Sequence, residues 1–117
     1  MTDLRTPSSQ EKAVIRALLQ SKPEMRHLFD ALDELLVTEI SDGGMGSLLL
    51  VPKDLVGVSR SFGQQVALGE FTDSDGTLVS VALNVDRQGR LYELDVWKVD
   101  FSPLVAWPDP SQIRVVS

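Results

Sequence analysis

Apolar residues recur at helical spacing in the first third of the chain. Ser8 and Glu11 have the spacing of a capping box, in which each side chain bonds a backbone N–H at the start of a helix. Pro23 cannot continue a helix, so the helix that begins at Ser8 should end near Ser21. The residues that share its apolar face are Val14, Ile15, Leu18 and Leu19.

A second amphipathic pattern follows Pro23 and predicts another helix over residues 23–36. Charged residues occupy its opposite side. Two short amphipathic helices joined by a tight link should form an αα-hairpin or corner. The apolar positions of the second helix repeat at intervals of three and four residues: Met25, Leu28, Phe29, Leu32, Leu35 and Leu36.

From Val37 onward the pattern changes to the two-residue period of β-strands. Val37, Thr38 and Ile40 are β-branched, and Ser41–Gly44 has the composition of a turn. Residues 53–62 are mixed and predict a loop with at most one helical turn. The remaining expected strands are residues 48–51, 65–71, 77–85 and 90–99, with 113–116 as a short edge strand.

These elements predict an α+β fold, with two N-terminal helices packed on one face of an antiparallel β-meander sheet of about five strands. The chain has 117 residues, which suits one domain. We expect residues 1–7 to form a flexible N-terminal tail and residues 8–117 to form that single domain.

The last long hairpin has one apolar face and one polar face. A turn centred on Arg87 and Gln88 pairs Leu83 with Tyr92, Val81 with Leu94, and Val79 with Val96. We expect the helices to pack on the face formed by these pairs. The opposite face then carries Glu93, Asp95 and Trp97, because a slip by one residue would mix apolar and polar positions.

The preceding hairpin admits two registers. A turn that ends in a left-handed Gly76 with a bulge pairs Phe71 with Val79 and places Glu70 beside Ser80. A plain two-residue loop would reverse the faces of that strand. We favour the bulge, because it buries Phe71 and exposes Glu70.

Charge and composition exclude several classes of function. The chain has 17 acidic and 11 basic residues, a net charge of −6 and no cysteine. This charge disfavours nucleic-acid binding and attachment to anionic membranes, and the lack of cysteine excludes disulfides and zinc–cysteine sites. The N-terminus has no apolar signal core, so we expect a cytoplasmic protein. The sequence does not fix the oligomeric state.

Three carboxylates on the outer side of the predicted sheet form the first candidate site. Glu70, Glu93 and Asp95 are close enough there to hold a hard cation or to do acid–base chemistry. A solvated outer face of a one-sided sheet has the same pattern without any function, and we favour that interpretation. Trp97 beside the acids suits an anchor for a protein partner, unless the C-terminal segment covers it.

Two glycine-containing segments resemble ligand-binding loops. Residues 84–89 have oxygen donors at the spacing of an EF-hand loop, but their flanks alternate like strands, so a hairpin turn is the better interpretation. Gly43, Gly44 and Gly46 resemble a phosphate-binding loop, but no lysine follows and the next element reads as a strand. Turn geometry explains these glycines, although close approach of another backbone or of a ligand stays open. The sequence predicts no metal and no cofactor.

The segments Gly43–Leu48, Asp73–Gly76, Leu83–Asp86 and Leu91–Leu104, together with Gly89, carry a resemblance to a known family. The sequence resembles a set of short bacterial proteins that share a domain of unknown function, and this resemblance implies no catalytic residue. Within the last segment, Lys98 lies between Asp95 and Asp100. Ion pairs that fix the exit of the strand are the favoured interpretation, and a recognition surface that includes Trp97 is the alternative.

Two functions from different classes follow from these patterns. The favoured one is a cytoplasmic module that binds another protein through the acidic sheet face, and a toxin-neutralising immunity protein would be one form of it. The alternative is a protein that binds a small ligand or divalent metal, and that could be an enzyme. Its site would be the glycine loop 43–47 or the carboxylates at 70, 93 and 95. We expect no enzymatic activity.

Overall fold

The capping box at Ser8 opens the first helix as the sequence predicts. The computed structural model describes residues 3–116, and in it α1 (Ser9–Gln20) begins with a reciprocal pair of hydrogen bonds. The Glu11 N–H donates to Ser8 Oγ at 3.1 Å, and the Ser8 N–H donates to Glu11 Oε1 at 2.8 Å. The expected apolar face of α1 is buried.

The second helix is shorter than predicted. It consists of η1 (Pro23–Met25), α2 (Arg26–Asp30) and η2 (Ala31–Glu34), and the chain is already a strand at Leu35. The prediction that the helix extends to Leu36 is wrong, because Leu35 and Leu36 pair with the neighbouring strand. Sheet pairing here overrides a helical spacing of apolar residues.

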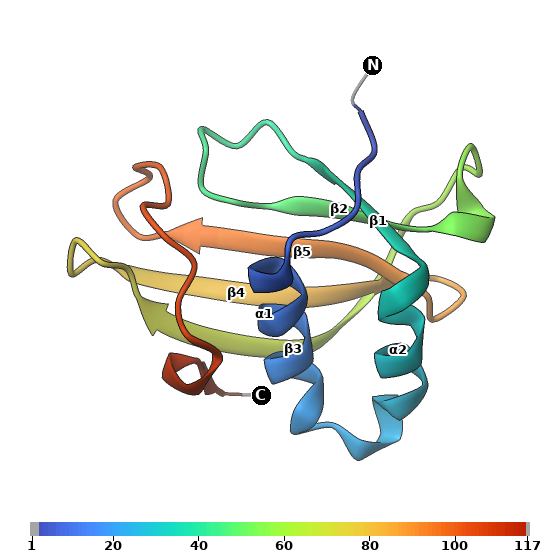
Figure 1. Cartoon of the computed structure of the whole chain (residues 1–117), viewed down its shortest axis with the longest axis horizontal. Coiled ribbons are helices and arrows are strands. Elements are labelled where there is room, and N and C mark those ends of the chain that lie inside the picture. Colours follow the sequence, from blue (N-terminus) through green and yellow to red (C-terminus); the bar gives the residue numbers. More distant parts are fainter. Residues whose placement is uncertain (1–2, 117) are drawn as a thin grey trace.

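All neighbouring strands of the sheet are antiparallel, and their order is β1-β2-β5-β4-β3-β6. The strands β1 to β5 are labelled in Figure 1. This confirms the α+β prediction, with six strands where about five were expected. Short 3-10 turns η3 (Lys53–Leu55) and η4 (Pro110–Gln112) lie in the connections. The strands are β1 (Leu35–Glu39), β2 (Leu48–Pro52), β3 (Phe62–Thr72), β4 (Leu78–Asp86), β5 (Leu91–Lys98) and β6 (Arg114–Val115).

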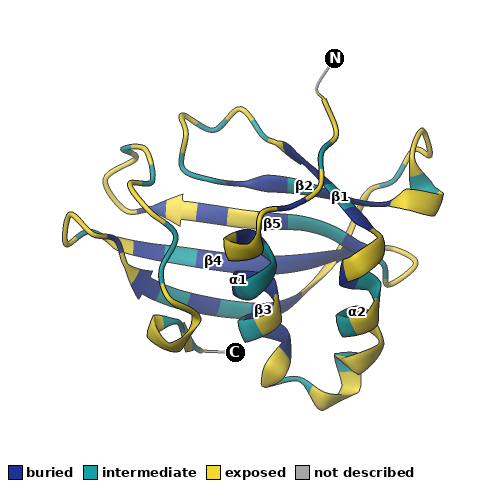
Figure 2. Cartoon of the chain, viewed as in Figure 1, coloured by how far each residue is buried: buried dark blue, intermediate teal, exposed yellow. Residues whose placement is uncertain are grey.

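The helices and the C-terminal segment cover the same face of the sheet, which we call the inner face (Figure 1). Leu104, Trp107 and Ile113 pack against the buried core from the C-terminal segment. The other side is the outer face, and the alternation of buried and exposed residues along β5 separates the two (Figure 2). Because the C-terminal segment lies on the inner side, Trp97 on the outer face stays 47% exposed.

Both meander hairpins keep the predicted faces, except at Leu91 and Tyr92 next to the second turn. Phe71 pairs with Val79 and Glu70 with Ser80, and Gly76 has φ +87°, which confirms the bulged turn. The second hairpin differs by two residues, since Leu83 pairs with Leu94. The shift is even, so the apolar residues stay on the inner face.

Two one-residue irregularities produce this shift. A three-residue turn brings Asp86 opposite Arg90, where the Asp86 N–H donates to Arg90 O at 2.8 Å and Gly89 has φ +80°. A bulge then makes Tyr92 the extra residue between the pairs Asn84–Glu93 and Val85–Leu91. Leu91 is therefore in the core, whereas Tyr92, which was expected on the apolar face, is not.

The N-terminal segment, expected to be a tail, is held at Arg5. Its backbone forms a bridge with Val37 at the edge of β1, and its guanidinium donates to both carboxylate oxygens of Glu11. Helices long and apolar enough to cross a membrane do not occur among residues 3–116.

Candidate functional site

The outer face of β5 presents the residues that the sequence singles out. Glu93, Asp95 and Trp97 alternate outward along the strand and lie opposite Asn84, Ala82 and Ser80 of β4. Ser80 in turn lies opposite Glu70, so Glu70 shares a row with Trp97 across three strands. The structure therefore places Glu70, Glu93, Asp95 and Trp97 on one face.

The carboxylates on this face do not converge into a metal site. Glu70 is paired with Arg114, and Glu93 accepts a hydrogen bond from Asn84 Nδ2 at 3.0 Å. Asp95 is exposed. Across residues 3–116 the structure brings together no group of three or more His, Asp or Glu side chains that could hold a metal ion. The arrangement gives an acidic surface and not a chelating cluster.

Lys98 points to the inner side and is completely buried, with 0% exposure. Its Nζ donates to Asp73 Oδ2 at 2.8 Å, to Asp75 Oδ2 at 2.6 Å and to Pro103 O at 3.0 Å. Lys98 therefore forms ion pairs at the end of β5, but its partners come from the β3–β4 turn. Strand alternation separates Lys98 from Asp95, so Lys98 cannot touch a partner on the outer face.

Asp73 connects the β3–β4 turn to the segment that follows β5. Besides Lys98, the backbone N–H groups of Val105 and Ala106 donate to its carboxylate at 2.8 Å and 3.2 Å. Burial alone would raise the pKa of Asp73, but the hydrogen bonds from Lys98 and from backbone N–H groups outweigh it and lower the pKa to about 2. The side chain is therefore ionised at neutral pH.

The glycine loop binds its own chain. The Asp42 carboxylate accepts hydrogen bonds from the N–H groups of Met45 at 3.1 Å and Ser47 at 3.0 Å. These hydrogen bonds and burial act oppositely on Asp42, and its pKa is lowered. A loop that already holds an internal carboxylate has these donors occupied, so it does not resemble an open phosphate cradle.

The glycines permit close approach of residues 103–107. A Cβ at Gly44 would lie 3.3 Å from Pro103 Cβ, and one at Gly46 would lie 3.2 Å from Leu104 Cδ2. The Leu104 N–H also donates to Gly44 O at 2.9 Å. Of the two alternatives that the sequence leaves open, the structure shows the approach of another backbone segment.

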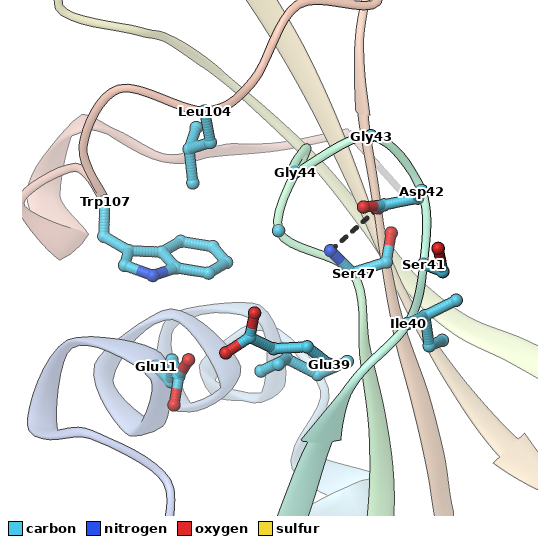
Figure 3. Close-up of a pocket in the computed structure, with 12 residues that line it drawn as sticks. Glu11, Glu39, Ile40, Ser41, Asp42, Gly43, Gly44, Ser47, Leu104 and Trp107 are labelled. Carbon is cyan, nitrogen blue, oxygen red and sulfur yellow. Dashed lines mark hydrogen bonds between the residues drawn. The ribbon is translucent and has the colours of Figure 1, made fainter. Parts of the chain in front are cut away.

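A cavity of about 510 Å³ lies between this loop, the start of α1 and the C-terminal segment (Figure 3). Trp107 and Leu104 border one side, and Glu11 and Glu39 lie across from them. Arg5 donates to Glu11 at 2.8 Å and lies 3.6 Å from Glu39. Glu11 and Glu39 thus already share an internal cationic partner, Arg5.

Comparison with known proteins places the chain in a family. A model described as a domain of unknown function (DUF6984) matches residues 4–108, which is most of the sequence. The chain belongs to the DUF6984 family. Neither the curated proteins nor the solved structures contain a match. For this DUF6984 protein, functional inference therefore rests on its own geometry.

An exposed apolar patch at the end of β5 extends the candidate surface of the DUF6984 domain. We define the aromatic patch as Leu78, Trp97, Val99 and Phe101, whose exposed fractions are 43%, 47%, 41% and 68%. The rings of Trp97 and Phe101 lie 6.1 Å apart between centroids. Val99 and Phe101 were not predicted from the sequence to belong to this surface. Val99 continues the outward alternation of β5, but Phe101 follows the strand and has no such signal.

Proposed function

We propose that this DUF6984 protein is a protein-binding module whose contact surface is the aromatic patch and its neighbouring carboxylates. Phe101 is the observation that carries the proposal. It has φ +63°, a left-handed conformation that costs a residue with a side chain about 1 kcal/mol. The residue held in that conformation is 68% exposed. Backbone strain combined with an exposed apolar side chain is typical of binding surfaces.

The strained residue is anchored on both sides. The Phe101 N–H donates to Lys98 O at 2.9 Å, and the buried Lys98 Nζ binds Pro103 O at 3.0 Å. Asp100, between them, accepts from the Ser102 N–H at 3.0 Å. A surface that is ordered before binding loses less conformational entropy on association, which supports a role in recognition.

The charges around the patch define the chemistry of the partner. Asp95 lies beside Trp97 on the outer face, Asp100 precedes Phe101, and the net charge is −6. A fitting partner is a protein with an apolar socket rimmed by Lys or Arg side chains. A second copy of this acidic chain fits poorly, because like charges would oppose each other. A basic toxin would have this chemistry; an immunity role and a cytoplasmic location stay predictions from the sequence.

The test compares two surface variants. The double variant Trp97→Ala/Phe101→Ala removes both rings, and Val56→Ala removes a side chain that is 51% exposed outside the patch. We expect lysate proteins retained by the wild type to be retained by Val56→Ala and lost by the double variant. With the purified partner, calorimetry should show binding weakened at least about 30-fold, as for interface hot spots, and association slowed by salt. Equal retention by the double variant and the wild type would refute the proposal.

A further inference from the structure

The aromatic patch has ring faces that the two rings do not cover for each other. The rings of Trp97 and Phe101 are tilted by 59°, with their centroids 6.1 Å apart. A tilted pair covers at most one face of each ring, and the two residues are 47% and 68% exposed. The face of an aromatic ring carries the negative part of its quadrupole, so an uncovered face attracts a cation.

Two carboxylates beside these rings have no cationic partner. Asp95 is exposed and lies two residues before Trp97 on the same face of β5, roughly 7 Å away along the strand. Asp100 precedes Phe101, and its Oδ1 accepts both hydrogen bonds from Ser102, at 3.0 Å and 2.6 Å. In the part of the chain that the structure describes, neither aspartate forms an ion pair. The negative charge beside the rings is therefore uncompensated.

The described residues also supply no cation to these rings. An arginine does lie over an aromatic ring near the other end of β5, where the Arg60 guanidinium is 5.3 Å from the centroid of the Tyr92 ring. Over residues 3–116, no Lys or Arg side chain makes such a contact with Trp97 or Phe101. A cation at the patch would therefore come from another molecule.

We propose that the patch binds an arginine side chain of the partner protein, with the guanidinium stacked on the ring pair and its N–H groups directed to Asp95. This inference rests on the proposed function, because it names the residue with which the partner meets the patch. A guanidinium is planar and weakly hydrated, so it stacks on an aromatic face while its N–H groups bind a carboxylate. The ammonium group of lysine is a compact, strongly hydrated charge and lacks this fit.

An NMR titration with three small probes tests the inference without the partner. The probes are acetyl-argininamide, acetyl-lysinamide, which has the charge without the plane, and acetyl-citrullinamide, which has the plane without the charge. At constant ionic strength, the indole N–H resonance of Trp97 reports the affinity of each probe. We expect the arginine probe to bind about 3- to 10-fold more tightly than the citrulline probe and at least about 2-fold more tightly than the lysine probe. An arginine probe that bound no more tightly than either of the others would overturn the proposal.

Single substitutions with a charge-matched control locate the bound guanidinium. Asp95→Asn should weaken the arginine probe about 2- to 5-fold and leave the citrulline probe unchanged. Asp33→Asn removes the same charge at an exposed position of η2, away from the patch, and should change neither. Trp97→Ala, followed through the Phe101 N–H resonance, should weaken the arginine probe at least about 3-fold. Equal weakening by Asp95→Asn and Asp33→Asn would mean that the net charge attracts the probe, and the proposed contact would be wrong.

The failure of this inference differs from the failure of the proposed function. Loss of the retained lysate proteins by Trp97→Ala/Phe101→Ala, without selective binding of the arginine probe, would overturn the arginine contact alone. Equal retention by that double variant and the wild type would refute the protein-binding function, whatever the probes show.

Discussion

Replacing Asp73 by asparagine tests whether the buried ion pair with Lys98 holds the chain that follows β5. The Asp73 side chain is 0% exposed and accepts from Lys98 Nζ at 2.8 Å and from the N–H groups of Val105 and Ala106. Asparagine removes the charge, and its amide NH₂ group would face the N–H donors that the carboxylate now binds. Breaking one partner of a buried pair costs about 3–5 kcal/mol. Asp75 remains to neutralise Lys98, so we expect the lower end, about 3 kcal/mol.

Thermal unfolding gives the readout for Asp73→Asn. With an unfolding entropy of about 2 cal/mol/K per residue, such a loss corresponds to a fall in Tm of roughly 12 °C for this chain. Asp100→Asn is the matched control, because this exposed carboxylate also accepts hydrogen bonds, from the Ser102 N–H and Oγ. The control should leave Tm within about 2 °C of the wild type. Equal Tm values for the two variants would refute the assigned role of Asp73.

The pH dependence of the free energy of unfolding provides a second test of the Asp73 ion pair. The pKa of Asp73 is about 2 in the folded protein, below its usual value near 3.9 in an unfolded chain. The unfolded state therefore takes up the proton first as pH falls. The stabilisation by ionised Asp73 is fully present above about pH 4 and is lost as pH falls from about 4 to 2. In urea unfolding, the stabilities of the wild type and of Asp73→Asn should converge as pH falls from about 4 to 2. A difference in stability that did not change with pH would contradict the lowered pKa of Asp73.

Two further comparisons between variants test local strain. Phe101→Gly should be about 1 kcal/mol more stable than Phe101→Ala, because glycine adopts φ +63° without the Cβ penalty; equal urea midpoints would show that this backbone is unstrained. Gly46→Ala should lower stability by about 2 kcal/mol, since its Cβ would crowd Leu104 in addition to the strain of φ +106°. Gly89→Ala, which has φ +80° and open space, should lower it by only about 1 kcal/mol, and an equal loss would argue against the crowding.

The faces of the sheet could be predicted from sequence because they depend only on alternation. The register of the β4–β5 hairpin could not be predicted, since the bulge at Tyr92 and the three-residue turn each add one residue. The two errors together preserve the faces, so Glu93 and Asp95 lie outside as expected. The end of the second helix was mispredicted because Leu35 fits a helical period and a strand equally well.

Contacts between residues far apart in the chain could not be predicted from the sequence. Nothing in the local pattern indicates that Lys98 would reach Asp73 and Asp75 in another turn, or that β2 would lie beside β5. The nearest carboxylates in sequence, Asp95 and Asp100, suggested the wrong partners. Tertiary proximity decides such pairs, and the strained Phe101 has no sequence signal because left-handed backbone is read mainly from glycine.

Three of the segments that carry the family resemblance meet in space: the glycine loop, the β3–β4 turn and the segment that follows β5. Gly44 accommodates Pro103, and Lys98 ties the β3–β4 turn to the same segment. These residues are buried or engaged within the chain, so their chemistry explains how the segment is held and not what it binds. Trp97 and Phe101 are the aromatic side chains that these segments leave exposed to solvent. A binding module needs this division, because contact residues can then change with the partner while Asp73 and Lys98 keep the fold.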